Sequence, residues 1–349
     1  MFDTRLFRPG GPVKPEERDW PSFRSAINAA MREEMRRDPL VFQMGEDIAG
    51  ASPFGVTTGL AAEFGRERIR DAPCAEVAVV GAAVGAAIGG MRPIVEFQFG
   101  DFLSVAVDPL THQAAMLRYL TGGQVKVPIV IRLPCGGGQG AGSQHSQSLY
   151  SWFAHVPGIK VVLPSTSMDA KTLMKAAVRD DNPVLFFEHK QLYRTRWPIA
   201  DSDRAAYADP EHAGELGRAL VRREGTDVTV VATLTMVHHA LAAARGLATQ
   251  GISVEVVDPR TLVPFDTATL VRSVRKTGRL LVVDEAYLNF GIQAEVIATA
   301  AEQAFDALKS APRRLGNPNV PVPFAPPLQD EVLPNQARIA AAIVAMVKG

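Results

Sequence analysis

The stretch that decides the fold is residues 76–97, EVAVVGAAVGAAIGGMRPIVEF. Its first part is almost entirely small and apolar, and glycine recurs in it every fourth residue, at Gly81, Gly85 and Gly89. Residues four apart share one face of a helix, so the pattern predicts a helix over 77–90 with one face of very small side chains. A helix that is apolar all round is buried, and this one is expected to pack closely, for example against its counterpart in a second subunit. The residues that follow, 93–97, predict a strand.

Predicted strands and helices alternate on both sides of this stretch. Upstream, Ser22 caps a helix with apolar residues at helical spacing, and 40–44 follows as a buried strand. Downstream, a helix is predicted over 102–119 with a kink at Pro109. The later elements are a helix at 168–179 and strands at 128–133, 159–163 and 184–188. Apolar strands that alternate with helices predict a parallel sheet.

The chain has 349 residues, which is too long for one ordinary core and fits two α/β domains. A polar, irregular segment at 196–215 is the predicted linker. It separates an N-terminal arm (1–20) and a first domain (21–195) from a second domain (216–349). In the second domain, the strands are predicted at 228–234, 253–257 and 280–284, with helices after each. The proline-rich segment 312–334 is expected to wrap over the surface before a closing helix at 333–347.

The composition excludes several classes of protein. Lys+Arg and Asp+Glu both number 37, so the chain lacks the basic excess that nucleic-acid binding requires. No apolar run is long enough to cross a bilayer, and the N-terminus lacks the apolar core of a signal peptide. The two cysteines, Cys74 and Cys135, form no CxxC pair and are predicted to be reduced thiols of a cytoplasmic protein. We therefore expect neither nucleic acid nor a membrane as a partner.

Residues 136–142, GGGQGAG, follow a predicted strand and fit a relaxed G-x-G-x-x-A pattern. A dinucleotide site would need a helix directly after them and an acidic residue about 20 positions further on. Polar residues follow instead, and no acidic residue lies between Gly142 and Val162. The pattern favours a flexible or closely packed loop that presents His145, whose polar neighbours can fix its tautomer. A loop histidine without a catalytic role is the alternative. The nearby serines form no nucleophile elbow of a serine hydrolase.

Glu76 stands between the strand-like stretch 69–74 and the start of the apolar helix. A carboxylate near a helix N-terminus is stabilised by the helix dipole, whereas apolar surroundings favour its protonated form. Its structural role would be to cap the helix, and its functional role would be to hold a ligand nitrogen. The residues alone leave both interpretations open.

From residue 20 onward, the chain resembles the beta subunit of the decarboxylating component of 2-oxo acid dehydrogenase complexes. In the first domain, the matching stretches include AINAAMREEMRRDPLVFQMGEDIAG, AEVAVVGAAVGAAIGGMRPIVEFQF and QHSQSLYSWFAHVPGIKVVLPS. In the second domain, they include VEVVDPRTLVPFD and VVDEA. The resemblance implies a pyrimidine-binding thiamine-enzyme domain followed by a transketolase C-terminal-like domain.

The resemblance also implies a thiamine-diphosphate site between alpha and beta subunits of an alpha2beta2 heterotetramer. Glu76 matches the family glutamate that hydrogen-bonds the aminopyrimidine ring and promotes the reactive form of the cofactor. Cys74 matches a position whose backbone meets the same ring, and Gln98 and Phe102 match positions that pack around the cofactor. His145 matches the active-site histidine that handles protons or orients the lipoyl group.

The resemblance also implies that the enzyme holds two metal ions, K⁺ and Mg²⁺. Family members hold a structural potassium ion through backbone carbonyls and a carboxylate, at positions that match Ile129, Ala177, Asp180 and Asn182. Thiamine enzymes hold Mg²⁺ and the diphosphate with a GDG…N motif, which this sequence lacks. In this family the motif sits on the alpha chain, so the absence fits.

The first functional hypothesis is therefore a beta subunit that, with an alpha subunit, oxidatively decarboxylates a 2-oxo acid and passes the acyl group to a lipoyl acyltransferase core. Because Gln98 is polar, we expect a branched-chain 2-oxo acid. The alternative is a two-subunit acetoin-cleaving or transketolase-like enzyme with the same cofactor. A non-enzymatic scaffold for the acyltransferase core is a third hypothesis, which the retention of both Glu76 and His145 disfavours.

Overall fold

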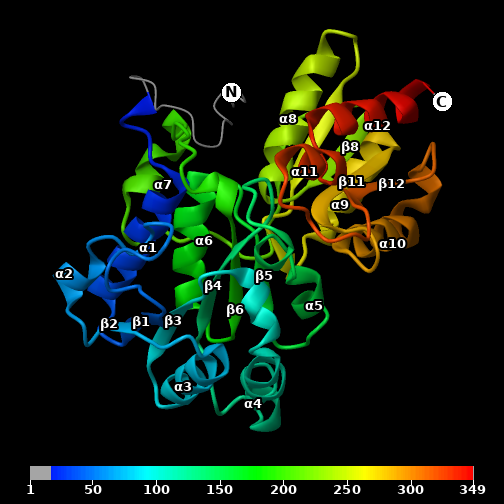
Figure 1. Cartoon of the computed structure of the whole chain (residues 1–349). Helices are drawn as coiled ribbons and strands as arrows, with labels where there is room; N and C mark the ends of the chain where they lie inside the picture. Colours follow the sequence, from blue (N-terminus) through cyan, green and yellow to red (C-terminus); the bar gives the residue numbers. More distant parts are fainter. Residues whose placement is uncertain (1–16, 349) are drawn as a thin grey trace. The chain divides into compact units, whose positions relative to one another are not determined.

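The structure, a computed structural model, describes residues 17–348, and these form two compact units (Figure 1). The N-terminal unit comprises 17–135 and 152–216, and the C-terminal unit comprises 217–348 together with 136–151. The predicted α/β fold with two domains is confirmed. Chain order does not reveal that 136–151, which follows a strand of the first sheet, groups with the C-terminal unit. Most of the predicted N-terminal arm (1–16) lies outside the described residues.

The N-terminal unit is built on a parallel sheet whose strands run in the order β5-β6-β4-β3-β1-β2. Its inner strands are short, mostly apolar and buried on both faces, as the sequence pattern predicts, whereas Arg70 and Asp71 on the edge strand β2 are exposed. Their bounds are β1 Val41–Gly45, β2 Ile69–Asp71, β3 Arg92–Glu96, β4 Val130–Cys135, β5 Lys160–Val162 and β6 Val184–His189.

Two helices of this unit, α1 (Phe23–Arg37) and α6 (Ser167–Arg179), pack side by side (Figure 1). As predicted, Ser22 caps α1 and accepts a hydrogen bond from the backbone of Ser25. Between the two helices, the buried carboxylate of Glu34 accepts hydrogen bonds from Arg179, the shortest at 2.6 Å. Two smaller helices belong to this unit, α2 Leu60–Phe64 and α7 Arg204–Ala208, the latter within the predicted linker. Helix α5 (Tyr150–Ala154) begins in the segment 136–151 of the C-terminal unit and ends in the N-terminal unit.

The predicted small-residue helix forms as α3 (Glu76–Ile88). One face is buried, with Val80 and Ala83 fully inaccessible, and α3 packs against β3. The opposite face is exposed, and a Cβ atom added at Gly81 or Gly85 would meet nothing within 4 Å. The expectation of full burial therefore does not hold within this chain, because its own sheet covers only one side of the helix.

The single helix predicted over 102–119 is wrong. The segment is broken into a 3-10 turn at Gly100–Ser104, a π-helical turn at Pro109–Ala114 and a short helix α4 at Leu117–Leu120. Proline has no N–H to donate and crowds the preceding turn, so a regular helix cannot run through Pro109. In the π-helical turn, Ala115 donates to the carbonyl of Leu110, five residues earlier.

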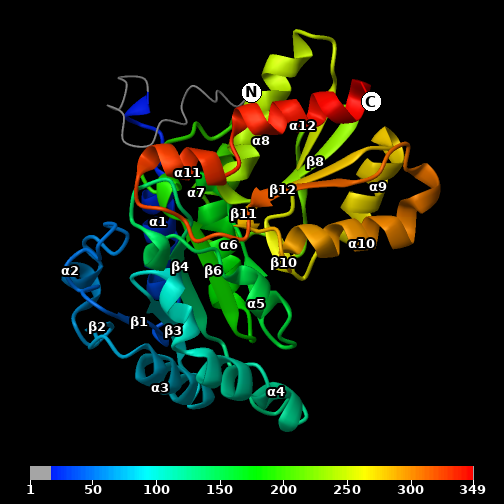
Figure 2. The ribbon, with the colours of Figure 1, turned by 45° about the vertical axis from the view of Figure 1, so that its right-hand side comes forward.

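The C-terminal unit has a sheet in the order β12-β11-β8-β9-β7, parallel except for β7, which is antiparallel to β9. Side chains alternate along β11, so that Leu281 and Val283 lie in one apolar core while Leu280 and Val282 lie in another. Helices α8 and α12 contribute to the first core, and α9 and α10 to the second (Figures 1 and 2). The strands are β7 Leu220–Arg223, β8 Val228–Ala232, β9 Val254–Asp258, β11 Leu280–Tyr287 and β12 Arg313–Asn317, with a short β10 at Thr261–Val263. The helices are α8 Leu234–Ala248, α9 Thr267–Thr277, α10 Ile292–Ala304 and α12 Gln336–Lys348.

The proline-rich segment 312–334 is more ordered than predicted. Its proline-free part forms strand β12, which pairs with β11, and Pro326–Val332 forms helix α11 (Figure 2). The closing helix is confirmed as α12, which buries Ile339 and Ile343. Across residues 17–348, no helix combines the length and the apolar character that a membrane span requires.

Candidate functional site

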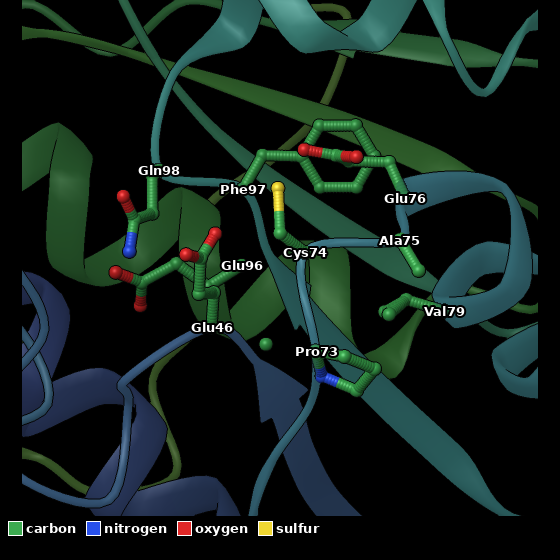
Figure 3. Close-up of a pocket in the computed structure, with 10 residues that line it drawn as sticks. Glu46, Pro73, Cys74, Ala75, Glu76, Val79, Glu96, Phe97 and Gln98 are labelled. Carbon is green, nitrogen blue, oxygen red and sulfur yellow. The ribbon is translucent and has the colours of Figure 1, made fainter.

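A pocket lies at the edge of the N-terminal sheet where β1, β2 and β3 end (Figure 3). Its lining consists of residues at or just after the ends of these strands: Gly45, Glu46, Pro73, Cys74, Ala75, Glu76, Val79, Glu96, Phe97 and Gln98. The pocket spans about 250 Å³, part of it open to solvent. The carboxyl ends of parallel strands are the usual ligand-binding edge of α/β folds. The geometry therefore marks this edge as the candidate site of the N-terminal unit.

Glu76 enters the pocket as the first residue of α3 and is half-buried. The preceding residue, Ala75, has no side-chain group that could cap the helix, so the carboxyl of Glu76 provides negative charge at the positive end of the helix dipole. Glu76 thus lies both at the helix start and in the pocket, as the structural and the functional interpretation each require.

Cys74 lies between the carboxyl group of Glu76 and those of Glu46 and Glu96 in the view of Figure 3. Its side chain is exposed, and the negative charges of Glu76 and Glu46 raise the pKa of its thiol. The thiol therefore stays protonated and is a poor nucleophile at neutral pH. The role of the Cys74 backbone beside a cofactor ring stays a prediction.

Behind the pocket, Glu96 belongs to a buried ionic cluster. Arg132 on β4 donates to Glu96 on β3 and, through two hydrogen bonds of 2.7 and 2.8 Å, to Glu188 on β6. Tyr193 donates to the same Glu188 at 2.8 Å. Burial raises the pKa of Glu96 and Arg132 opposes that shift, whereas Glu188 and Glu96 together raise the pKa of the Arg132 guanidinium against the effect of burial. The cluster fixes the floor of the pocket by tying three adjacent strands together.

The sequence alone did not indicate the pocket residues Glu46, Glu96 and Phe97 or the cluster residues Arg132 and Glu188. The four charged residues among these could have been recognised from their places in the sequence. Each lies in or directly after an otherwise apolar strand, and a charge in a buried strand needs a partner.

Gln98 lines the pocket, as its predicted place around a cofactor requires, but Phe102 does not. Phe102 lies in the 3-10 turn after β3 and packs edge-to-face on Phe99, with ring centroids 6.0 Å apart. The aromatic side chain that lines the pocket is Phe97, which is almost wholly buried.

His145 belongs to the C-terminal unit, and its position relative to Glu76 is not defined by the fold of either unit. It ends a 3-10 turn at Ser143–His145 and is half-buried. No α-helix starts between the glycine loop and Tyr150, so the dinucleotide pattern lacks the helix that would bind a phosphate. The loop is instead closely packed, which is one of the two expectations for it.

The residues predicted for a potassium ion lie close together, but their oxygen atoms already have partners. The carboxylate of Asp180 forms an ion pair with Lys160 and accepts two hydrogen bonds from Asn182, at 2.9 and 2.8 Å. The side-chain oxygen of Asn182 accepts from Arg118 at 2.7 Å. The carbonyls of Ala177 and Ile129 accept backbone hydrogen bonds. Potassium would have to displace Lys160, so the site stays a prediction that this arrangement does not favour.

The residues that line the pocket have the chemistry that the aminopyrimidine part of thiamine diphosphate requires. A nitrogen-rich planar ring requires a carboxyl partner, further polar groups and an apolar surface. Glu76 and Gln98 offer the first two, and Val79 and Phe97 offer the third. Within 17–348, no three His, Cys, Asp or Glu side chains gather so as to hold a metal ion.

Two protein-family models match successive parts of the chain. Residues 20–196 match the transketolase pyrimidine-binding domain, and residues 217–339 match the transketolase C-terminal domain. Among solved structures, the chain is similar to a split-gene transketolase, described as an inactive beta4 tetramer, with a TM-score of 0.76. That alignment covers 94% of this chain and 98% of the other at 23% identity, which shows a shared fold.

Closer relatives are found among curated proteins. The chain is 46% identical to the beta subunit of acetoin:2,6-dichlorophenolindophenol oxidoreductase from Cupriavidus necator, over 94% of this chain and 98% of the relative. It is 43% identical to the beta subunit of 2-oxoisovalerate dehydrogenase from Bacillus subtilis, over 92% and 97%. It is 42% identical to a beta subunit of the mitochondrial pyruvate dehydrogenase E1 component from Oryza sativa subsp. japonica, over 90% and 82%.

Proposed function

Because this chain belongs to the family of beta subunits of the 2-oxo acid and acetoin dehydrogenases, we propose that it forms half of a thiamine-diphosphate site and is active together with an alpha subunit. The observation that carries the proposal is the position of Glu76. Its carboxyl lies at the N-terminus of α3, in a pocket at the carboxyl ends of three parallel strands. This chain would bind the aminopyrimidine end of the cofactor, and the alpha subunit would bind the diphosphate and Mg²⁺.

The residues of this chain would then have separate roles. When bound, thiamine diphosphate supplies a carbon nucleophile for a substrate carbonyl group. Glu76 holds a proton against a nitrogen of the aminopyrimidine ring. Phe97 and Val79 exclude water from that ring, and Gln98 orients it through hydrogen bonds. His145 moves a proton or orients the lipoyl group during acyl transfer.

The exposed face of α3 supports assembly with another subunit. Val77 and Ile88 on this face are 48% and 47% exposed, and the glycines between them allow a second backbone to come close. We expect an alpha2beta2 heterotetramer in the cytoplasm that docks on a lipoyl acyltransferase core. A structural potassium ion remains a lesser part of the proposal.

For the substrate, a branched-chain 2-oxo acid is the first candidate, in line with the relative named for 2-oxoisovalerate. Acetoin is the second candidate, because the relative named for acetoin is 46% identical to this chain, against 43% for the relative named for 2-oxoisovalerate.

The experiment is co-expression with an alpha subunit that carries the GDG…N motif, followed by calorimetric titration with thiamine diphosphate. The proposal expects tight, magnesium-dependent binding by the complex and poor binding by this chain alone. Tight binding by the isolated chain would contradict the half-site.

A second assay separates the activities. The complex is offered a branched-chain 2-oxo acid, pyruvate or acetoin, with lipoyl protein as the acceptor. Acyl transfer to the lipoyl protein supports a dehydrogenase, and the preferred substrate identifies which kind. Transfer of a ketol group to an aldehyde, without lipoyl acylation, would show the transketolase-like alternative instead.

A further inference from the structure

The loop that carries His145 is fastened at both ends to two consecutive residues of β11. Near its start, the backbone N–H of Gly137 donates to the carboxylate of Glu285. At its end, the hydroxyl of Tyr150 donates to the carboxylate of Asp284. All these residues belong to the C-terminal unit, and Asp284 lies 134 positions from Tyr150 in the sequence. One strand end therefore sets the position of the whole segment between 137 and 150.

The attachment at Asp284 is deeply buried. Tyr150 and Asp284 are both inaccessible to solvent, and Glu285 is 7% exposed. The same oxygen of Asp284 that binds Tyr150 also accepts from the hydroxyl of Thr233 at 2.5 Å and from the backbone of Glu285 at 2.9 Å. Buried polar groups with several mutual hydrogen bonds hold a single geometry, because breaking one leaves a desolvated group without a partner.

Between its two attachments the loop is also held in the middle. Gly140 donates a backbone hydrogen bond to the side chain of Gln329 at 3.2 Å. A Cβ atom at Gly142 would overlap the ring of Phe324, so the backbone lies directly on that ring. His145 comes three residues later, and its N–H points to the carbonyl of Gly142 at 3.3 Å. The imidazole is therefore presented by a fixed segment.

We propose that Asp284 and Glu285 are positioning residues that place His145 for its step of the reaction. The proposal rests on the role given to His145 under the proposed function. Neither acid needs to touch substrate or cofactor, because each acts through the backbone or the tyrosine at one end of the loop. Shifting a catalytic group by about 1 Å can cost about 100-fold in rate, so loss of an attachment should be visible in turnover.

The test is a double-mutant cycle in the complex with the alpha subunit, using Tyr150→Phe and His145→Ala. Tyr150→Phe removes only the hydroxyl and should lower kcat about 10-fold or more, with little change in substrate KM. If the hydroxyl acts through His145, the double variant should be no slower than His145→Ala alone. Asp284→Ala should behave like Tyr150→Phe, whereas Asp284→Asn retains an oxygen acceptor and should restore most of the activity.

Thr229→Val is the matched control. Thr229 is a buried residue of the same sheet whose hydroxyl bonds to Thr277, Ser273 and Glu255, all of which lie outside the His145 loop. It should lower the melting temperature about as much as Tyr150→Phe, yet leave kcat within twofold.

Two results overturn the proposal in distinguishable ways. If His145→Ala is inactive but Tyr150→Phe keeps full activity, or if their losses multiply in the double variant, the positioning role is wrong while the proposed function stands. If His145→Ala itself keeps full activity, the role of His145 in the proposed function fails, and the positioning role with it.

Discussion

Arg132 binds Glu188 on the neighbouring strand through two hydrogen bonds, and both side chains are wholly buried. The same guanidinium also reaches Glu96, which lines the candidate pocket. The floor of the pocket is thus held by a charge network inside the sheet. Such a network contributes little net stability over an apolar core, but removing one member leaves uncompensated charge.

We therefore expect Arg132→Met to lower the free energy of unfolding of the N-terminal unit by about 3–5 kcal/mol, because two buried carboxyl groups lose their cation. Urea denaturation followed by fluorescence measures the change. Replacing Glu96, Arg132 and Glu188 together by apolar residues should recover much of the loss. A change below about 1 kcal/mol for Arg132→Met would contradict the role of the cluster.

A second prediction concerns Gly142. Gly142→Ala should impair activity, because the backbone has a φ of +77° and the new Cβ would overlap the Phe324 ring. Gly251→Ala is the control, since Gly251 has the same φ of +77° in the same unit but nothing lies within 4 Å of its added Cβ. Backbone strain should lower the free energy of unfolding of each variant by about 1 kcal/mol, but only Gly142→Ala should reduce kcat. Equal kcat values for the two variants would show that the Phe324 contact does not matter.

A third prediction uses the pKa of Asp284, which burial raises to about 6 from an ordinary value of 3.8, with the charge of Glu285 adding to the shift and the hydrogen bonds from Thr233 and Tyr150 opposing it. Between pH 3.8 and about pH 6, Asp284 holds a proton in the folded protein that it has lost in the unfolded chain. The stabilisation is therefore present at low pH and is lost as the pH rises through about 6. Asp284→Asn removes this titration, so its stability relative to the original protein should rise by roughly 2–3 kcal/mol between pH 4 and pH 7.5.

Chemical denaturation at several pH values measures this difference. Asp201→Asn, at an exposed aspartate of the other unit, should show no such trend. A difference between Asp284→Asn and the original protein that stays constant with pH would mean that Asp284 does not titrate as described.

A fourth prediction concerns the thiol of Cys74. Because Glu76 and Glu46 raise its pKa, only a small fraction is thiolate at pH 8, and reaction with a disulfide reagent should be slow despite its exposure. Glu46→Gln removes one of the negative charges, lowers the pKa of the thiol and should speed labelling several-fold. Cys74→Ser should abolish labelling, because Cys135 is buried. Labelling that is fast and indifferent to Glu46 would contradict the electrostatic explanation.

Much of the fold could be predicted from the sequence because it depends on local patterns. Strand-length apolar runs such as 184–188 and the capped helix after Ser22 carry their structure in their own residues. The prediction of one helix over 102–119 was wrong because apolar residues continue at helical spacing across Pro109, although a proline interrupts a regular helix. The exposed face of α3 was also missed, because periodicity shows that a face is small and apolar but not what covers it.

A residue of the candidate site could be predicted where its chemistry explains why it stands at a particular place in the sequence. Glu76 at the start of an apolar helix is such a case, and the pocket lies there. The partners that depend on distant segments were not predictable. Glu285 and Gly137 are 148 positions apart, and Asp284 on β11 is recognisable as a partner of the His145 loop only from the hydrogen bond that Tyr150 donates to it.

Whether Glu76 takes part in the reaction is decided by the turnover of the complex with the alpha subunit when Glu76 is replaced by alanine. Glu67→Ala, at an exposed glutamate of the same unit, is the control. Loss of a group that holds a proton at the reacting system costs about 100-fold to 10,000-fold in rate. We expect a loss in that range for Glu76→Ala, whereas the turnover of Glu67→Ala should stay within twofold of the original. Turnover by Glu76→Ala within threefold of the original complex would contradict it.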